Sequence, residues 1–183
     1  MSNASSAWSF LRGKGLSATA TAGVLGNLQQ ESNINPTDGG GGIAQWQGGR
    51  WTALVSYARQ RGLSPYSLQA QLEFLWGEMT GTAGDGENFF AAIGGEAHFN
   101  AMSPSAAAQT FCNVFERPGT PMMSNRIRYA QDIYAQFNTP SQPSQPNPVV
   151  QVVTSHPLYS VLGLGLLAAA GYFGYRYYKD RRR

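Results

Sequence analysis

Apolar residues recur at helical spacing through most of residues 1–137, and Gly, Ser and Pro separate the periodic segments. Ser17 is placed to cap a helix that runs to about Ser32, because a serine hydroxyl accepts a hydrogen bond from the unpaired amides of a first helical turn. Four later helices are each marked by a set of apolar residues on one face. These sets are Trp51, Leu54, Val55 and Ala58; Leu68, Leu72, Leu75 and Met79; Ala107, Phe111, Val114 and Phe115; and Ile127, Ala130, Tyr134 and Phe137. Ser64 and Ser103, each followed by Pro, are expected to start the second and third of these four helices.

The same residues contain no alternating run long enough for a sheet, so the predicted fold class is mainly α. The exception is GGGGIAQWQGG, Gly39 to Gly49, which suits a short glycine-rich β-hairpin or an extended loop. Residues 1–137 are therefore predicted to form one helical domain, and a chain of 183 residues leaves room for only small additions to it.

Composition divides the rest of the chain into three short segments. Residues 138–155 are rich in Pro, Ser and Gln, which favours an extended linker. Residues 156–178 contain 19 uncharged residues from Pro157 to Tyr175, and such a run matches a hydrocarbon core roughly 30 Å thick. Residues 179–183 form a basic tail. The pattern predicts one C-terminal transmembrane helix, inserted in a lipid membrane with its cationic end on the inner side.

The net charge of +3 belongs to this C-terminal end, since residues 1–155 carry 8 Lys/Arg against 9 Asp/Glu, and residues 156–183 carry 5 against 1. A nucleic-acid surface needs clustered cations on the folded domain, so no nucleic-acid partner is predicted. Cys112 is the single cysteine, and scattered carboxylates supply no ligand cluster, so neither a metal nor another cofactor is predicted. Residues 1–15 lack the basic and apolar regions of a secretory signal peptide.

Glu31 is the most informative acidic residue, because it lies on an apolar helix face. Val24, Leu28 and Glu31 stand at i, i+4 and i+7 of the first predicted helix. Partial burial disfavours an ionised carboxylate, so the pKa of Glu31 is expected to be raised, as a general acid requires. Pro36 stops the helix shortly afterwards, which places Glu31 in its last turn. The alternative is an ordinary surface glutamate followed by a flexible glycine turn.

The glycine run that follows predicts a close approach of the backbone to a ligand, because glycine has no Cβ. Gln45 adds an amide and Trp46 an aromatic face, which are the usual partners of sugar hydroxyls and sugar rings. Together with Glu31, these groups predict a saccharide site.

The segment GVLGNLQQESNINP, followed by GGGGIAQWQGGRW, resembles the phage tail lysozyme family of the lysozyme-like superfamily. The resemblance continues through LEFLW, VFERPG and RIRYAQDIYA, and so covers roughly residues 8–137. The glutamate-serine pair and the loop are also similar to those of goose-type lysozymes and soluble lytic transglycosylases, although the AYNAG segment of the transglycosylases is missing.

This resemblance implies a lysozyme-like fold and bacterial peptidoglycan as the substrate, cleaved at the β-1,4 bond from N-acetylmuramic acid to N-acetylglucosamine. Glu31 would protonate the leaving oxygen, as in a muramidase or a lytic transglycosylase. A second carboxylate would stabilise the cationic transition state or activate water. Asp38 is either that group or a turn residue. Glu116 of the FERPG motif either lines the cleft or pairs with Arg117 or Arg126, and the structural role is favoured.

Further residues receive substrate-binding roles from the same pattern. Ser32 is expected to orient Glu31, Gln45 to bind an acetamido group, and Trp46 to stack on a sugar. Tyr129 either reaches the cleft or lies in the core.

Two classes of protein fit these features. The favoured one is a membrane-anchored enzyme in the internal membrane of a bacteriophage virion, where other virion membrane proteins would be its partners, or in a bacterial cell envelope. The other is a non-catalytic glycan-binding or structural protein that keeps the fold.

Overall fold

The computed structural model describes residues 1–84 and 88–139, which form one compact unit. Within these residues the chain is helical and contains no strand, as the mainly α prediction requires. The glycine-rich segment accordingly forms a loop with the short 3-10 turn η1 (Gly42–Ala44), not a β-hairpin. The loop alternative is therefore the one that the structure adopts.

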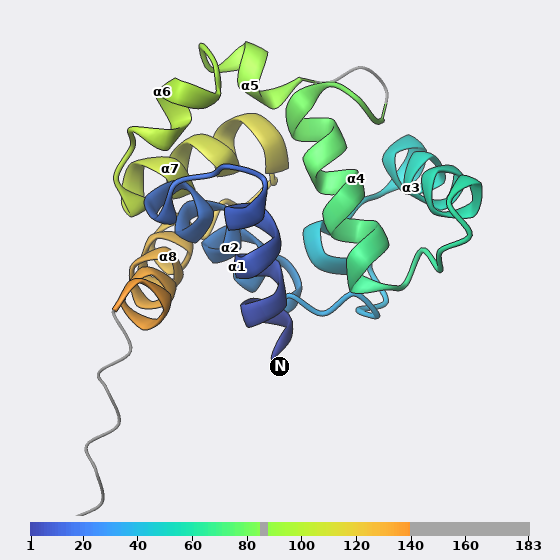
Figure 1. The fold of residues 1–183 in the computed structure, drawn as a ribbon, viewed down its shortest axis with the longest axis horizontal. Coiled ribbons are helices and arrows are strands. Elements are labelled where there is room, and N and C mark those ends of the chain that lie inside the picture. The colour runs from blue at the N-terminus through green and yellow to red at the C-terminus, as the bar shows by residue number, and fades with distance from the viewer. Residues whose placement is uncertain (85–87, 140–183) are drawn as a thin grey trace, which may run out of the picture. The chain divides into compact units, whose positions relative to one another are not determined.

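The helix α2 (Ala18–Ser32) lies at the centre of the unit, against α7 (Pro104–Phe111) and α8 (Met123–Asn138) (Figure 1). Two glycines let these helices approach closely. A Cβ added to Gly23 would lie 2.4 Å from Cβ of Ala107, and one added to Gly26 would lie 2.7 Å from the amide nitrogen of Ala130. Because real Cβ contacts are longer than this, any larger residue at Gly26 would push α8 away from α2.

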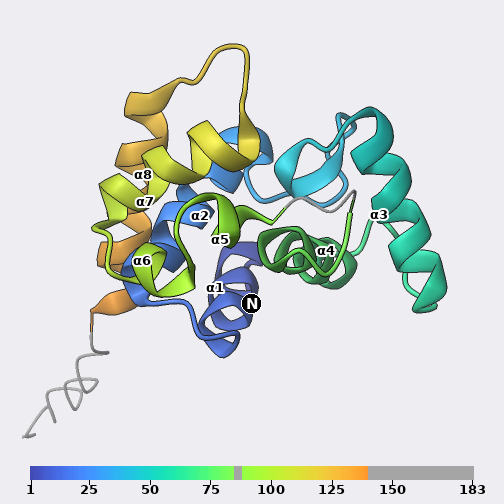
Figure 2. The same cartoon turned by 90° about the horizontal axis from the view of Figure 1, so that it is seen from above.

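The remaining helices enclose α2 and build a second side of the unit. The helix α1 (Asn3–Gly13) packs on α2 and α4 (Leu68–Thr80), and α4 also contacts α3 (Gly48–Gln60). Figure 2 shows α3 and α4 on one side and α2, α7 and α8 on the other. Two short helices, α5 (Phe89–Ala92) and α6 (Glu96–Asn100), precede α7. The chain of α7 continues into the single π-helical turn η2 (Cys112–Glu116).

Most of the predicted helices are confirmed, with two corrections. The hydroxyl of Ser17 caps α2 by accepting a hydrogen bond from the Ala20 amide, and Ser103 caps α7 in the same way. The predicted start at Ser64 is wrong, because α4 begins at Leu68 with Ser67 as its cap. Ser67 is also held by the Ser64 carbonyl, so the Ser-Pro pair forms the preceding turn.

The second correction concerns α8, whose buried face is shifted from the predicted one. Arg126, Ala130 and Ile133 are buried, at i, i+4 and i+7, whereas Ile127 and Tyr134 are only half-buried. A charged residue was not expected on that face. Arg126 is buried there because its guanidinium bonds Glu31 of α2.

The predicted transmembrane helix over residues 156–178, the linker over 138–155 and the basic tail over 179–183 lie outside the described residues, apart from 138 and 139. Among the residues that the structure does describe, no helix combines the length and the apolar character needed to cross a bilayer.

Candidate active site

Glu31 occupies the last turn of α2, as predicted from the sequence. The helix ends because Asn33 and Ile34 both adopt left-handed backbone conformations, with φ of 58° and 55°. Their amides donate hydrogen bonds to the carbonyls of Gln29 and Leu28, and these bonds cap the end of the helix before Pro36. Val24 and Leu28 are fully buried, and the side chain of Glu31 keeps 16% of its exposure. Glu31 is therefore held by a core helix at the edge of the solvent.

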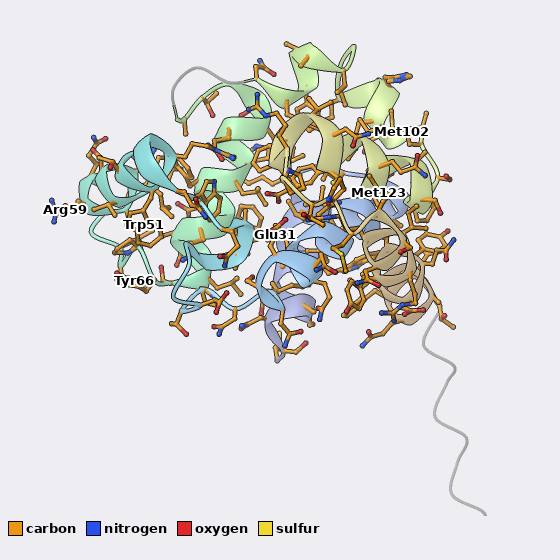
Figure 3. All side chains as sticks on the ribbon, turned by 180° about the vertical axis from the view of Figure 1, so that it is seen from behind. Glu31, Trp51, Arg59, Tyr66, Met102 and Met123 are labelled. Carbon is orange, nitrogen blue, oxygen red and sulfur yellow. The ribbon has the colours of Figure 1, made fainter. Side chains whose placement is uncertain are left out.

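The Glu31 hollow is a surface pocket of about 410 Å³. Three segments build it: the end of α2, the segment from the glycine loop into the first turn of α3, and the end of η2 with the residues that follow. Its lining residues are Glu31, Ala44, Gln45, Gln47, Arg50, Glu116, Arg117, Pro118 and Gly119. Figure 3 shows Glu31 near the middle of the unit, between the group of α3 and α4 and the group of α7 and α8. The structure thus brings together Glu31, Gln45 and Glu116 from the predicted set.

Arg126 is the partner that the apolar-face argument did not foresee for Glu31. Its guanidinium donates from Nη2 to Oε1 of Glu31 at 2.6 Å, and the Arg126 side chain is only 2% exposed. Its other nitrogens bond the side-chain oxygen of Asn27 at 3.0 Å and the carbonyl of Pro121 at 2.6 Å. The expected apolar surroundings of Glu31 are therefore corrected: a buried cation holds one carboxylate oxygen. A planar guanidinium fixes the direction of that oxygen as well as its charge.

Glu116 is the second carboxyl group of the Glu31 hollow, and it comes from the end of η2. Its atom Oε1 is shielded from solvent and accepts no hydrogen bond within the described part of the chain. Loss of solvation raises the pKa of Glu116 well above its usual 4.5, and the nearby charge of Glu31 raises it further, against the opposing effects of Arg50 and Arg126. Glu116 therefore keeps its proton to a higher pH than an exposed glutamate does.

The raised pKa of Glu116 predicts a pH dependence of stability. Below about pH 4.5 this residue is protonated in both the folded and the unfolded chain. Above that pH the unfolded chain releases the proton while the folded chain retains it, so the contribution of Glu116 to stability falls until the pH passes its folded pKa. Glu116→Gln imitates the neutral acid, so we expect urea midpoints of this variant to fall less between pH 4.5 and 8 than those of the parent. Equal slopes for the two proteins would contradict the assignment.

Trp46 has a structural role that differs from the predicted one. Its side chain is 1% exposed, its ring meets Phe74 edge-on at 5.5 Å between centroids, and its indole N–H donates to Oε2 of Glu78 at 2.8 Å. This enclosure gives the Trp46 ring a structural role in the core, and its stacking on a sugar stays a prediction. Arg50 completes this cluster by donating two hydrogen bonds to Glu78, at 2.8 and 2.9 Å.

Two glycines of the loop lie close to other parts of the protein. A Cβ on Gly42 would lie 2.4 Å from the side chain of Gln71, and one on Gly41 would lie 2.2 Å from the carbonyl of Trp46. Gln71 is fully buried, accepts from the Ile43 amide at 2.9 Å and donates to the carbonyls of Pro36 and Pro65 at 2.8 Å each. Glycine is therefore required at position 42 to wrap the loop around the buried amide of Gln71, and at position 41 to let the loop lie against the backbone of Trp46.

Asp38 does not line the Glu31 hollow. It lies in a neighbouring hollow, and its Oδ2 accepts a hydrogen bond from Nε2 of Gln45 at 2.8 Å. Gln45 has a left-handed backbone with φ of 48°, and it lines the Glu31 hollow. Asp38 thus reaches the Glu31 hollow through Gln45, and its catalytic role stays a prediction.

Ser32 and Tyr129 are not among the residues that line the Glu31 hollow, and their substrate-binding roles stay predictions. The hydroxyl of Ser32 donates a hydrogen bond to the carbonyl of Ile43 at 3.1 Å and accepts one from the Asn35 amide at 3.3 Å. These bonds connect the end of α2 to the glycine loop. Tyr129 is half-buried beneath the guanidinium of Arg128, 4.5 Å from the ring centroid, and does not line the Glu31 hollow.

Sequence reasoning missed Glu78, and it named Arg126 only as a possible partner of Glu116 and not of Glu31. The available signal was the one used for Glu31, a charged residue on an apolar helix face. Glu78 stands beside Leu75 and Met79 on α4, and Arg126 stands in register with Ala130 on α8. In residues 1–84 and 88–139, no cluster of His, Cys, Asp and Glu is arranged to hold a metal ion.

An acid held at the rim of a polar hollow, with a second carboxyl beside it, is typical of enzymes that cleave glycosidic bonds. The chain belongs to the phage tail lysozyme family, whose family model matches residues 2–137. This confirms the family assigned from the sequence, and it supports a lysozyme-like role in peptidoglycan cleavage. No curated protein matches the chain.

Proposed function

We propose that this protein cleaves the glycan strand of peptidoglycan, with Glu31 as the general acid. The observation that carries the proposal is the placement of Glu31 at the end of a core helix, partly exposed in a polar hollow and held by Arg126. Arg126 binds Oε1, so Oε2 is the atom left to carry the proton to the glycosidic oxygen. The sugar then develops the charge of an oxocarbenium ion.

The fate of that cation defines the product. Water attack gives a muramidase product with a reducing end, whereas attack by the 6-hydroxyl of the same sugar gives an anhydro end, as in a lytic transglycosylase. Glu116 shares the hollow with Glu31 and is favoured by its surroundings in the neutral form, so we assign it a hydrogen-bonding contact with the substrate.

Mass spectrometry of peptidoglycan digested by the full chain tests this function. The expected result is release of muropeptides that end in reducing or anhydro-N-acetylmuramic acid. Cleavage of peptide crosslinks without either product would refute the glycosidase assignment. The ratio of the two ends also separates the muramidase from the transglycosylase.

We further propose that residues 156–178 anchor the enzyme in the internal membrane of a phage virion, so that it opens the cell wall during genome entry. The support is the long uncharged run, the basic residues that follow it and the Pro-rich linker before it. Release from purified particles should require detergent, because an apolar anchor does not respond to ionic strength. Complete release by high salt alone would exclude the anchor.

A further inference from the structure

A second hollow of about 350 Å³ lies beside the Glu31 hollow, and Gln47 lines both of them. The start of the glycine loop, the first turn of α3 and the turn before α4 line it. Its side chains include Asp38, Gln47, Trp51 and Tyr66, and the backbone of the glycine run forms one wall. We call it the aromatic hollow.

Trp51 and Tyr66 form the apolar part of the aromatic hollow. Their ring centroids lie 5.5 Å apart with an interplanar angle of 49°, and Tyr66 keeps 56% of its exposure. In the described part of the chain, Met1 and Met122 are the other large hydrophobic residues with such exposure. Figure 3 shows the two aromatic side chains close together, on the α3 side of Glu31. An exposed aromatic ring supported by a second ring is a surface that can stack on a ligand.

The polar groups of the aromatic hollow restrict the chemistry of that ligand. The described residues that line it include the carboxylate of Asp38 and the amide of Gln47, and neither Lys nor Arg is among them. A phosphate or another anion would be repelled by Asp38 and would find no cationic side chain among these lining residues. A neutral ring with many hydroxyl groups fits better, because its apolar face stacks on the aromatic rings while its hydroxyls bond the carboxylate and amide.

The two hollows share a lining residue and are linked by a hydrogen bond. Gln47 lines both of them, and Gln45, which lines the Glu31 hollow, bonds Asp38 in the aromatic hollow at 2.8 Å. An extended polymer that occupied both hollows would pass over Gln47 on its way from Glu31 to Trp51 and Tyr66.

We propose that Trp51 and Tyr66 form a distal subsite that binds a pyranose ring of the same glycan strand, away from the bond that is cleaved. The inference rests on the proposed function, since it takes the strand in the Glu31 hollow as given. The subsite adds affinity for long strands and leaves the chemical step unchanged.

Binding of full-length protein to purified glycan strands, freed of their stem peptides, tests the subsite without turnover when Glu31→Gln is the parent. In this background we expect Tyr66→Ala and Trp51→Ala to weaken binding about three- to tenfold, the equivalent of one stacking contact. Tyr66→Phe should bind like the parent, because it keeps the ring. Trp51→Phe should bind with intermediate affinity and guards against a folding defect in Trp51→Ala. Met122→Ala, which removes an exposed side chain elsewhere, should have no effect.

Equal binding by the Tyr66→Ala variant and its parent would overturn the subsite. So would a loss that appears only when stem peptides are present, because the hollow would then recognise peptide. With Glu31 intact, the subsite also predicts that Tyr66→Ala raises KM on long strands but leaves kcat and the cleavage of short oligosaccharides unchanged. Failure of the proposed function has a separate signature: the protein with Glu31 intact would release no glycan fragments but would still bind strands through this surface.

Discussion

Glu31→Gln is expected to reduce the rate of cell-wall clearing by about 10²- to 10⁴-fold, the usual contribution of a general acid. Glutamine has nearly the same shape, and its amide oxygen can still accept the hydrogen bond from Arg126 that Oε1 accepts in the parent. It has no proton to transfer to the glycosidic oxygen, so the loss should appear in kcat. Turbidity of purified cell walls at several substrate concentrations measures this.

Asp132→Asn is the matched control for this change. Asp132 lies on the surface of α8, is 66% exposed and is 3.6 Å from Arg128, so removing its charge should leave clearing unchanged. If the Glu31→Gln protein clears walls as fast as the parent, Glu31 is not the general acid, and the non-catalytic glycan-binding alternative gains weight.

The same assay settles the identity of the second carboxyl group. Asp38→Asn should cost much less than Glu31→Gln, because Asp38 lies outside the lining of the Glu31 hollow and bonds Gln45, which lines it. Glu116→Gln should also be mild if Glu116 only donates a hydrogen bond, since the amide keeps a donor. A loss in either variant as large as that in Glu31→Gln would identify the changed residue as a catalytic carboxyl.

Arg126→Met is expected to lower the free energy of unfolding by about 3–5 kcal/mol, as for other buried ion pairs that lose one partner. The substitution fills part of the space, but it leaves the carboxylate of Glu31, the buried oxygen of Asn27 and the carbonyl of Pro121 without their donor. Urea unfolding at pH 7, followed by circular dichroism, measures the change.

Arg128→Met provides a control on the same helix, two residues further along. Arg128 is 58% exposed, and its pair with Asp132 is long, so its loss should change the unfolding free energy by less than about 1 kcal/mol. If both variants unfold at the same urea concentration, the Arg126 pair does not hold α2 against α8.

The central helix could be predicted closely because all its signals are local. Ser17 supplies the cap, the apolar residues supply the period, and Pro36 follows the stop. The buried face of α8 could not be predicted in this way, because apolar spacing alone favoured Ile127 over Arg126. The burial of Arg126 depends on Glu31 and Asn27, which are 95 and 99 residues away along the chain.

The glycine loop illustrates the same limit. Its glycines predicted that the backbone approaches another group closely, and the sequence pattern indicated a ligand as that group. The structure places the side chain of Gln71 against Gly42 and the carbonyl of Trp46 against Gly41. Gln71 belongs to α4, and no local pattern connects it with the loop.

The sequence by itself determined the family, the helical class and the position of Glu31 at a helix end, because each of these follows from short-range patterns. Apolar spacing alone does not distinguish Glu31 from Glu78, since both are acidic residues on apolar faces. The tertiary structure shows how their surroundings differ. Trp46 and Arg50 saturate Glu78 inside the core, whereas Arg126 holds one oxygen of Glu31 and the hollow leaves this carboxylate partly open to solvent. Long-range partners set the solvation and charge of a carboxyl group, and so decide whether it stabilises the fold or is available for chemistry.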